Sequence, residues 1–592
     1  TLLERDIPPG LVIVEAPMGE GKTEAAWILA EKWRHHGYQG LYMALPTMAT
    51  SDSLFERYRR DYLGAMARGE GARLVHGMAW LRDDKEPEQG LRLGERGDED
   101  RELAEAWFRP TRRAMLAAHG IGTVDQVLLA GMNVKFGFLR LYGLTGRVLV
   151  IDEVHAYDAY MSAILARLLR WCACLDIPVI LLSATLSAAQ RAAMIEAYGG
   201  ASGDPGPDAP YPLITIAEAG KSAQMMLVEA TGRRNLVIRR HSGLLGDAER
   251  TAALALALVK EGACCCVILN TVKQAQAVYQ ALALPDDQKM LFHARFTAAD
   301  RERIAAKVVE LFGKVRSKRP GRFILVATQV VEQSLDVDFD HMVSEIAPMD
   351  LLLQRSGRLY RHRPRPDSPV LNVLMPEGED GRFGATGYIY QAKPLLRTLA
   401  ILRDTDKVSL PGDFRVLIER CYGGETWDQS GVDWSSVKAA DQDWDKEAQL
   451  LASRAHEVSL QEPSLRRFRP VDNAPTGDDS DDGNGWRAKT RLGANDRSAL
   501  LLEAEEISRV ESGRLSQSEV RNLYRKSLKL PYYLPYDTPV AGFAPAVQGK
   551  GKCRGLTLLP MANGVWKGRD SKGKLYQVSY DETLGLLVRS TE

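Results

Sequence analysis

The sequence has few cysteines, no excess of charge of either sign and no long uninterrupted apolar run. Seven cysteines in 592 residues form neither a disulfide framework nor the spacing of a zinc site, which indicates a reduced, cytoplasmic setting. The longest apolar-rich stretch, residues 251–269, is broken by Lys260 and Glu261, so we expect no membrane span and no signal peptide. Lys plus Arg and Asp plus Glu both number 77. This balance argues weakly against a nucleic-acid partner unless the basic residues gather on one face.

The strongest signal in the chain is a strand, a glycine-containing loop and a helix in that order. Residues 11–14 are apolar and three of them are β-branched, which predicts a buried parallel strand, and residues 24–33 have helical composition. The loop between them reads Ala16-x-x-x-x-Gly21-Lys22-Thr23, the pattern of a phosphate-binding loop with Ala where the usual motif begins with Gly. That departure is mild because the first position only needs a small residue. The alternative is an ordinary strand-to-helix turn.

The residue types in this loop suit ATP. Glycines let backbone N–H groups turn toward phosphate oxygens at the positive end of the following helix. The lysine can reach the β- and γ-phosphates, and the Thr23 hydroxyl can bind Mg²⁺. We therefore expect ATP and Mg²⁺ as cofactors, held by Gly19, Glu20, Gly21, Lys22 and Thr23.

Two adjacent carboxylates, Asp152 and Glu153, follow a second hydrophobic strand. An acidic residue at the carboxyl end of a strand beside a phosphate loop can hold Mg²⁺ through water, and its neighbour can orient and deprotonate the attacking water. We assign the first role to Asp152 and the second to Glu153. The triplet Ser183-Ala184-Thr185 ends another core strand about thirty residues later, a combination more specific than either motif alone.

In the second half of the chain, predicted strands again alternate with predicted helices, but there is no second phosphate-binding loop. Gln354, Arg358 and Arg361 are spaced by four and three residues, which predicts one shared helical face. Such a face can present two guanidinium groups to a phosphate bound elsewhere, as an arginine finger acting across a domain cleft. A solvated basic helix surface is the alternative.

Shifts in composition predict four parts. A Gly- and Pro-rich stretch at residues 199–212 marks one boundary and an acidic stretch at residues 478–485 marks another. Because the chain begins with Thr ten residues before its first core strand, we expect the native protein to extend further at this end. The expected parts are a nucleotide-binding domain, a second α/β domain, a helical linker and a small α+β domain, at residues 1–205, 206–375, 376–475 and 476–592.

Taken together, residues 11–363 resemble the core of superfamily 2 helicases. The phosphate loop, the Asp152-Glu153-Val154-His155 box, the Ser-Ala-Thr triplet and Gln354-x-x-Gly357-Arg358-x-x-Arg361 occur in the family's order. The resemblance implies an α/β fold with two tandem RecA-like parallel-sheet domains that share one ATP. It also implies that Asp336 lies near the ribose, although Ser334 stands where many members have Gly. The upstream glutamine motif that reads adenine is not found in this sequence, and it would precede residue 1.

Within that superfamily, several phrases resemble the helicase-nuclease of type I CRISPR systems. They include residues 18–26, 152–158, 328–340 and 354–362, and the tail at residues 490–493 and 576–586 resembles subtype I-E. The resemblance implies ATP-driven 3′-to-5′ movement on single-stranded DNA and recruitment by the surveillance complex Cascade. The family normally carries an HD nuclease, but the ten histidines include no His-Asp dipeptide. We therefore assign no nuclease activity, and a fused or a separate HD nuclease both stay open.

Family analogy also suggests where DNA binds, although each residue alone would more often be a capping or surface residue. Basic runs at residues 314–322 and 355–365 could supply the positive charge that tracks a DNA backbone. The candidates for nucleic-acid contact are Thr47, Thr123, Asn270, Thr271, His293, Arg295 and Thr328.

Two other functions fit part of this pattern. An RNA helicase of superfamily 2 would share every motif, and a catalytically silent adaptor would use the same domains only to bind a partner. An adaptor has no need of an intact set of catalytic side chains. The complete set of catalytic side chains therefore argues against the adaptor. These residues are Lys22, Asp152, Glu153, Arg358 and Arg361.

Overall fold

The chain forms two compact units, each with its own sheet. The first unit comprises residues 1–234, 409–430 and 434–492, and the second comprises residues 235–408, 431–433 and 493–592. The structure is a computed structural model. It describes residues 5–17, 19–64, 72–75, 114–134, 137–184, 186–201, 206–230, 232–332, 335–363, 365, 367–378, 382–423, 434–463, 490, 497–511, 516–531, 533–534, 546–547, 551–552, 557–570 and 572–591.

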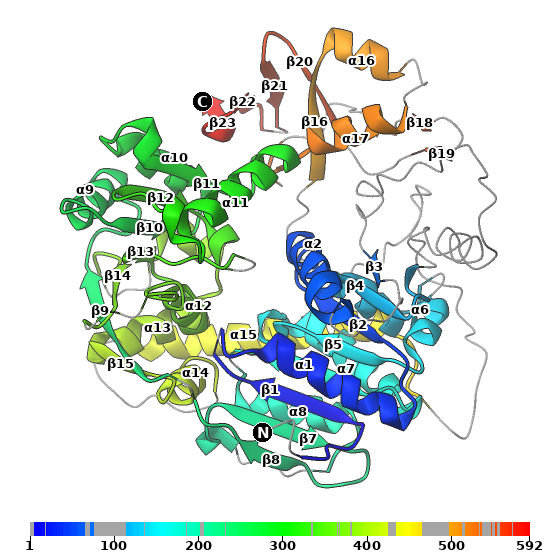
Figure 1. The fold of residues 1–592 in the computed structure, drawn as a ribbon. Coiled ribbons are helices and arrows are strands. Elements are labelled where there is room, and N and C mark those ends of the chain that lie inside the picture. The colour runs from blue at the N-terminus through cyan, green and yellow to red at the C-terminus, as the bar shows by residue number, and fades with distance from the viewer. Residues whose placement is uncertain are drawn as a thin grey trace. The chain divides into compact units, whose positions relative to one another are not determined.

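The sheet of the first unit has eight strands in the order β3-β4-β2-β5-β6-β1-β7-β8. Strands β3 to β1 in that order run parallel, and β7 and β8 are antiparallel additions at one edge (Figure 1). Their bounds are β1 Leu11–Glu15, β2 Leu41–Leu45, β3 Ala72–Val75, β4 His119–Thr123, β5 Val148–Ile151, β6 Val179–Ser183, β7 Leu213–Ala217 and β8 Gln224–Leu227.

Both faces of this sheet are covered, which explains the continuous apolar runs of its strands. Leu11 and Ile13 of β1 pack into one hydrophobic core, while Val12 and Val14 pack into another on the opposite face. The helices of this unit that precede β7 are α1 Lys22–Trp33, α2 Met48–Arg57, α5 Val124–Leu128, α6 Gly137–Leu144, α7 Ala159–Cys174 and α8 Ala188–Ala197.

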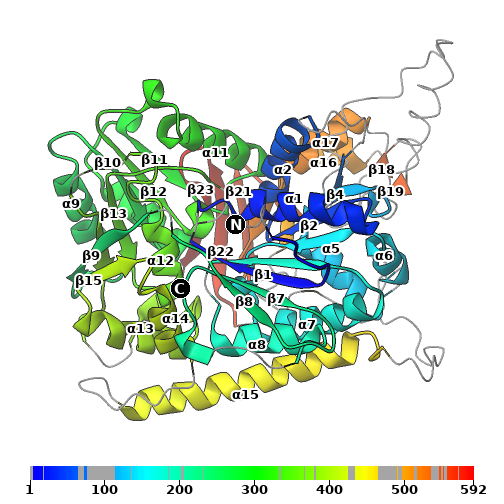
Figure 2. The same ribbon diagram turned by 60° about the horizontal axis from the view of Figure 1, so that its bottom comes forward.

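Two helices from much later in the chain complete the first unit. They are α14, Phe414–Tyr422, and the 25-residue α15, Trp434–Val458. Near its end, α15 places Ala455 and Val458 in the same core as Leu11 and the buried face of α7 (Figure 2). The expected linker region therefore contributes to the first unit's core as well as connecting domains.

The sheet of the second unit has seven strands in the order β11-β12-β10-β13-β14-β9-β15. The strands from β11 to β9 in that order run parallel. The strands are β9 Arg234–His241, β10 Cys264–Ile268, β11 Lys289–Phe292, β12 Phe323–Ala327, β13 His341–Glu345, β14 Val370–Leu374 and β15 Lys407–Leu410, and the helices are α9 Ala248–Leu258, α10 Val272–Ala281, α11 Ala298–Phe312, α12 Met349–Ser356 and α13 Ala392–Asp404.

The C-terminal part of the second unit is a small α+β structure with its own core. It contains a sheet in the order β17-β16-β20, a two-stranded pair β18-β19 and a meander β21-β22-β23. Trp566, Val578 and Leu586 lie in its hydrophobic core. Its elements are β16 Arg497–Glu503, α16 Ala504–Glu511, α17 Gln517–Arg525, β17 Leu528–Leu530, β18 Ala546–Val547, β19 Gly551–Lys552, β20 Thr557–Met561, β21 Val565–Arg569, β22 Leu575–Asp581 and β23 Gly585–Thr591.

The domain boundaries differ from the expected ones. The Gly- and Pro-rich stretch at residues 199–212 is a connection within the first unit, because the strands after it, β7 and β8, pair antiparallel beside β1. The first unit therefore continues to residue 234 rather than ending at 205. Of the charged and Gly-rich residues 64–105, only Gly64 and β3 belong to the part of the chain that the structure describes. In the part of the chain that the structure describes, no helix combines the length and apolarity needed to cross a bilayer.

Candidate active site

The strand order brings three motifs of the first unit to one edge of the sheet. Strands β5, β6 and β1 are neighbours and parallel, so their carboxyl ends meet at the same edge. The phosphate loop follows β1, Ser183 ends β6, and Asp152 and Glu153 follow β5. The sheet thus brings the phosphate loop to the same edge as two groups that follow it by more than a hundred residues in the sequence.

The phosphate loop has the backbone conformation that its glycines predict. Gly19 has φ 90° and Gly21 has φ 77°, values in the left-handed region that favour glycine. Lys22 begins α1, and its Nζ donates to the carbonyls of Ala16 at 2.7 Å and Pro17 at 3.3 Å. The lysine thus lies over the loop at the N-terminus of a helix, where an anion is favoured.

Asp152 and Glu153 are held together by a local hydrogen bond and an unusual backbone conformation. The Glu153 backbone is left-handed, with φ 55°, and its N–H donates to Asp152 Oδ1 at 2.9 Å. Burial, together with the negative charge of Glu153, raises the pKa of Asp152 to about 7, although Lys22 acts in the opposite direction. A cation bound at this carboxylate would favour its charged form, so the residues present suit Mg²⁺.

His155 connects the carboxylate pair to the neighbouring strand. Its Nε2 lies 3.2 Å from Glu153 Oε2, and its Nδ1 lies 3.0 Å from Ser183 Oγ. The two motifs that the sequence analysis combined by spacing are therefore joined through one imidazole. Thr185, the last residue of the Ser-Ala-Thr triplet, lies outside the described residues.

A buried ion cluster behind the phosphate loop was missed by the sequence analysis. Glu15, the last residue of β1, is completely buried and pairs with Arg191 of α8 at 3.2 Å and Arg415 of α14 at 2.8 Å. Arg415 also donates to the Leu186 carbonyl at 2.7 Å. An acidic residue inside an apolar strand was the available signal, because a charge in such a position requires a partner.

The expected shared face of Gln354, Arg358 and Arg361 is wrong. Helix α12 ends at Ser356, and Tyr360 has φ 52°, a conformation that stops a helix from continuing. Gln354 and Arg358 are buried within the second unit, and Arg358 Nη2 donates to the Glu332 carbonyl at 2.8 Å. Arg361 lies beyond the helix.

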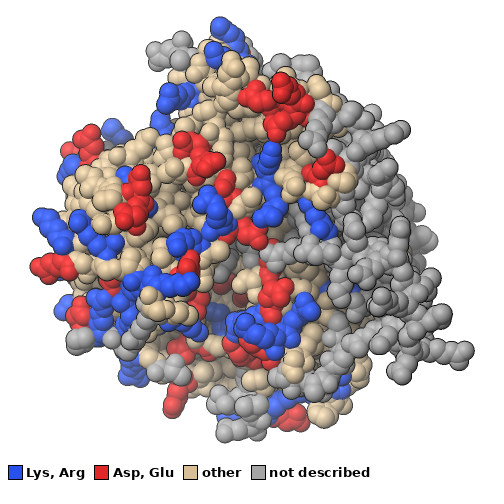
Figure 3. Space-filling model, turned by 45° about the horizontal axis from the view of Figure 1, so that its top comes forward, with Lys and Arg blue, Asp and Glu red and all other residues tan. Residues whose placement is uncertain are grey.

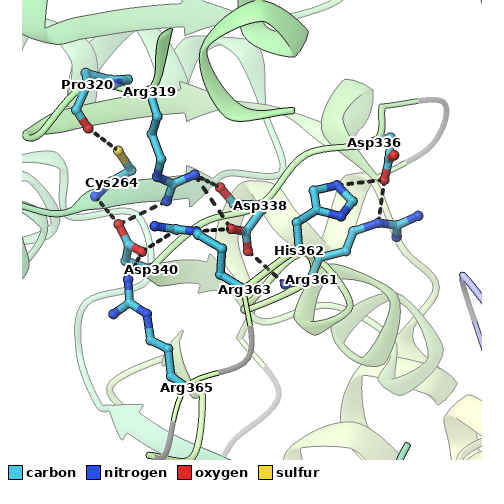
Figure 4. Close-up of polar contacts among 10 residues, drawn as sticks. All are labelled: Cys264, Arg319, Pro320, Asp336, Asp338, Asp340, Arg361, His362, Arg363 and Arg365. Atoms are coloured by element: carbon cyan, nitrogen blue, oxygen red, sulfur yellow. Dashed lines mark hydrogen bonds and ion pairs between the residues drawn. The ribbon is translucent and has the colours of Figure 1, made fainter. Parts of the chain in front are cut away.

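Beyond the helix, alternating arginines face alternating aspartates. Every second residue of an extended chain points the same way, and the segment carrying Asp336 is bridged to the segment carrying Arg361 at Phe339 and Leu359. We call the resulting set, drawn in Figure 4, the Asp–Arg ladder: Asp336, Asp338, Asp340, Arg361, Arg363 and Arg365.

The ladder fixes the main chain at Arg361. The backbone N–H of Arg361 donates to Asp338 Oδ1 at 2.7 Å, and the other oxygen of Asp338 accepts from Arg363 Nε at 2.7 Å. The Arg361 side chain donates through Nε to Asp336 Oδ1 at 2.7 Å. The two residues expected beside ribose and phosphate, Asp336 and Arg361, therefore pair with each other here.

The basic runs proposed for DNA are largely paired within the second unit. Lys318 lies 2.8 Å from Glu310, and Arg319 lies 3.0 Å from Asp340. Lys314 is exposed and lies 3.6 Å from Asp336. On the face shown in Figure 3, basic and acidic side chains are intermixed.

The expected nucleic-acid residues gather at strand ends, and most have a local structural partner. Thr47 caps α2 and accepts from the Thr50 N–H at 3.2 Å, and Thr123 ends β4, which pairs with β2. In the second unit, Thr271 caps α10, while Thr328 follows β12 and is buried. Asn270 is also buried, with its amide donating to Ile346 O at 2.9 Å and Thr386 Oγ1 at 3.0 Å.

His293 is covered by the C-terminal part of the second unit. Its side chain is fully buried, and Nε2 lies 2.9 Å from the Leu584 carbonyl. The Arg295 carbonyl accepts from the Leu586 N–H at 3.0 Å. Burial lowers the pKa of His293 to about 4, which keeps the imidazole neutral. In this structure, His293 therefore belongs to an internal contact and is not presented to a nucleic acid.

Comparison with known proteins places the chain in a family. Residues 261–364 match the family described as "CRISPR-associated nuclease/helicase Cas3, C-terminal". The "CRISPR-associated endonuclease/helicase Cas3" of Thermus thermophilus is 35% identical over 99% of this chain and 70% of its own length.

Solved structures give the same likeness. The crystal structure of T. fusca Cas3 with AMPPNP has a TM-score of 0.79 at 30% identity and covers 98% of this chain and 68% of its own. A chain in a "CRISPR RNA-guided surveillance complex, pre-nicking" has a TM-score of 0.70 at 28% identity, with the same two coverages. These structures confirm the expected fold class, two tandem RecA-like domains followed by a smaller C-terminal domain. The chain, which spans about two thirds of the length of these proteins, belongs to the Cas3 family of CRISPR-associated nuclease/helicases.

Proposed function

We propose that this chain is the ATP-driven motor of a Cas3 protein, moving 3′-to-5′ along single-stranded DNA and separating duplex strands. One observation carries the proposal. The phosphate loop, the Asp152–Glu153 pair and the His155 contact to Ser183 meet at the carboxyl edge of one parallel sheet. The AMPPNP named with the T. fusca Cas3 structure supports ATP as the nucleotide.

In the proposed hydrolysis of ATP, a few side chains have distinct roles. Lys22 binds the β- and γ-phosphates, and Glu153 orients the attacking water and accepts its proton. A magnesium ion held by Thr23 Oγ1 and Asp152 would neutralise charge on the phosphates. Gln354, Arg358 and Arg361 are the candidates in the second unit for stabilising the charge that develops in the transition state. Arg361 has to leave Asp336, its partner at 2.7 Å, in order to take that role.

DNA binding is assigned to the strand ends of both units. Hydroxyl and backbone groups there suit contacts to phosphates and sugars, which give affinity without sequence preference. Asn270 and His293 are engaged inside the protein, so we assign them to supporting the strand ends. The residues proposed to contact the strand are Thr47, Thr123, Thr271, Arg295 and Thr328; Thr123 and Thr328 are buried in this structure and would have to become accessible at their strand ends.

The partners follow from the family. The surveillance complex named with one structural neighbour supports recruitment by Cascade. An HD nuclease, fused or separate, is the second proposed partner, because a motor that pulls single-stranded DNA supplies the substrate that such a nuclease cuts.

A strand-displacement assay tests the direction of movement. Duplexes with a 3′ or a 5′ single-stranded tail are incubated with ATP and Mg²⁺, and release of the labelled strand is measured. We expect release from the 3′-tailed duplex alone, and none with AMPPNP or with Lys22→Ala. Equal release from both duplexes, or release from the 5′-tailed one only, would contradict the proposed direction.

A further inference from the structure

Arg355 is a buried arginine of α12 whose five N–H donors all have partners inside the second unit. It lies on α12 next to Gln354 and is 0% exposed. A guanidinium has five N–H donors in a rigid planar fork, and here every donor has an acceptor. Nε donates to Glu332 Oε1 at 2.6 Å, Nη1 to Ser344 Oγ at 2.7 Å and the Glu345 carbonyl at 3.1 Å, and Nη2 to Asn270 Oδ1 at 3.2 Å and Tyr390 OH at 3.1 Å.

The acceptors join the ends of three adjacent strands. Strands β12, β10 and β13 are parallel neighbours, and Asn270 follows β10 while Ser344 and Glu345 close β13. Glu332 follows the short turn after β12. One side chain therefore joins the ends of β10, β12 and β13, and the proposed function assigns the ends of β10 and β12 to DNA.

Tyr390 ties a fourth segment to the same site. It follows the 3-10 turn Gly384–Tyr388, outside every motif that the sequence analysis singled out. Its hydroxyl accepts from Arg355 and also from Gln329 Nε2 at 3.2 Å, and Gln329 donates in turn to the Asn270 carbonyl at 3.0 Å. Two residues beside proposed DNA contacts, Asn270 and Gln329, are thus linked to α12 through one phenol and one guanidinium.

The same group reaches the residues expected to act on ATP. Gln354 is the sequence neighbour of Arg355, and Arg358 donates to the carbonyl of Glu332, whose carboxylate binds Arg355. A shift of the strand ends that moved Glu332 would therefore move both Arg355 on α12 and Arg358, which lies just beyond the end of this helix.

We propose that Arg355 is a positioning residue that couples DNA contact at the strand ends of β10 and β12 to the placement of Gln354 and Arg358. This inference rests on the proposed function, because it presumes that DNA stimulates ATP hydrolysis. Arg355 touches neither DNA nor ATP in this account. Its hydrogen bonds make the positions of Gln354 and Arg358 depend on the positions of the strand ends of β10 and β12.

The mildest test is Tyr390→Phe, which removes one hydrogen-bond acceptor, the phenol hydroxyl. The hydrogen bond from Arg355 Nη2 to Asn270 Oδ1 remains, and so does the one from Gln329 to the Asn270 carbonyl. The matched control is Tyr360→Phe in the same unit, whose hydroxyl donates to Asp367 Oδ2 at 2.9 Å at the surface. ATP hydrolysis is measured with and without single-stranded DNA, as kcat and KM for ATP. We expect Tyr390→Phe to lower DNA-stimulated kcat by roughly threefold to tenfold, with basal kcat and KM within twofold of wild type, and Tyr360→Phe to behave as wild type.

A second variant, Arg355→Lys, keeps the positive charge beside Glu332 but has three donors on a flexible stem instead of the fork. We expect it to lose at least tenfold of DNA-stimulated kcat, a larger loss than Tyr390→Phe. Its unfolding midpoint shows whether it has folded, and the tyrosine pair carries the test if it has not. Equal losses of basal and stimulated rate in Tyr390→Phe, or no difference from Tyr360→Phe, would overturn the coupling role. A wild type that hydrolyses ATP without any response to DNA would instead overturn the proposed function, and this inference with it.

Discussion

Asp152 and Glu153 are adjacent in sequence, yet their surroundings differ in a way that suits the two roles proposed for them. Burial and the charge of Glu153 raise the pKa of Asp152 to about 7, as expected for a carboxylate that needs a cation to stay charged. Glu153 is held in a left-handed conformation with its carboxylate beside His155. A fixed carboxylate with a hydrogen-bonded neighbour suits the orientation of a water molecule.

Substituting Glu153 by Gln separates nucleotide binding from hydrolysis. The amide keeps an oxygen near His155 and keeps the side-chain volume, but it cannot accept a proton from water. We expect kcat for ATP to fall by about 10²-fold or more, while the equilibrium Kd for ATP stays within about threefold. Glu196→Gln, at an exposed position of α8 in the same unit, is the matched control and should leave both quantities unchanged. If Glu153→Gln hydrolysed ATP at the wild-type rate, Glu153 could not be the residue that accepts the proton of the attacking water.

Several side chains were predictable from sequence because their chemistry is local. Gly19, Gly21 and Lys22 follow a recognisable strand and have the expected backbone and position. The partners of Glu15 and Arg355 were not predictable, because they come from segments hundreds of residues apart or from outside any motif, as Arg415 and Tyr390 do. Ion pairs and buried hydrogen bonds are set by the tertiary fold, and composition reports only that a partner is required.

At the scale of elements, the turn between β22 and β23 fastens the C-terminal part to the second sheet. We call residues 581–586 the docking turn. Gln276 Nε2 donates to the Leu584 and Leu586 carbonyls at 2.7 and 2.9 Å. Gly585 has φ 72°, and a Cβ at this position would lie 2.6 Å from His293 Cε1. The turn therefore requires glycine for its conformation and for its approach to the imidazole.

Gly585→Ala should loosen this contact. The matched control is Gly573→Ala in the turn between β21 and β22, where φ is 83° and nothing lies within 4 Å of the added Cβ. Both variants carry the strain of alanine at positive φ, so their difference isolates the collision. We expect Gly585→Ala to be less stable than the control by about 1–3 kcal/mol in free energy of unfolding, with faster hydrogen exchange at the Thr297, Ala298 and Leu586 amides, which bond across this contact. Equal stability and exchange in the two variants would show that the docking turn does not hold the C-terminal part.

The elements themselves were largely predictable, and the exceptions have physical causes. Core strands such as β6 and β12 are short apolar runs buried on both faces, a pattern that needs no tertiary information. Helix α12 was expected to extend through Arg361 because arginines recur at helical spacing. The chain instead leaves the helix at Gly357 and pairs in extended form, and the alternation of Asp336, Asp338 and Asp340 was the signal that favoured this outcome.

At the scale of the whole molecule, the two units each contain one large, mainly parallel sheet, but they carry different candidate functional residues. The first unit carries the phosphate loop and the carboxylates, whereas the second carries Arg358, Arg361 and the ladder that fixes their backbone. Some of the basic side chains counted in the net charge are paired within this ladder, where arginines contact aspartates. Net charge was therefore a poor guide to nucleic-acid binding, which we assign to strand ends.

The assignment of chain segments to the two units was not predictable from the sequence. Helices α14 and α15 follow the second sheet in sequence and belong to the first unit. Their anchors are Arg415, which pairs with Glu15, and the apolar residues near the end of α15. Each such helix is amphipathic, and an amphipathic pattern shows that a face is buried without showing against what.

The central claim is that this chain hydrolyses ATP in response to single-stranded DNA. Steady-state hydrolysis with Mg²⁺ is measured at one fixed salt concentration with no nucleic acid, single-stranded DNA, double-stranded DNA or single-stranded RNA, with Lys22→Ala as the inactive reference. We predict strong stimulation by single-stranded DNA and little by the other two. Stimulation by RNA alone would identify an RNA helicase instead, and hydrolysis no faster than Lys22→Ala under every condition would contradict the motor itself.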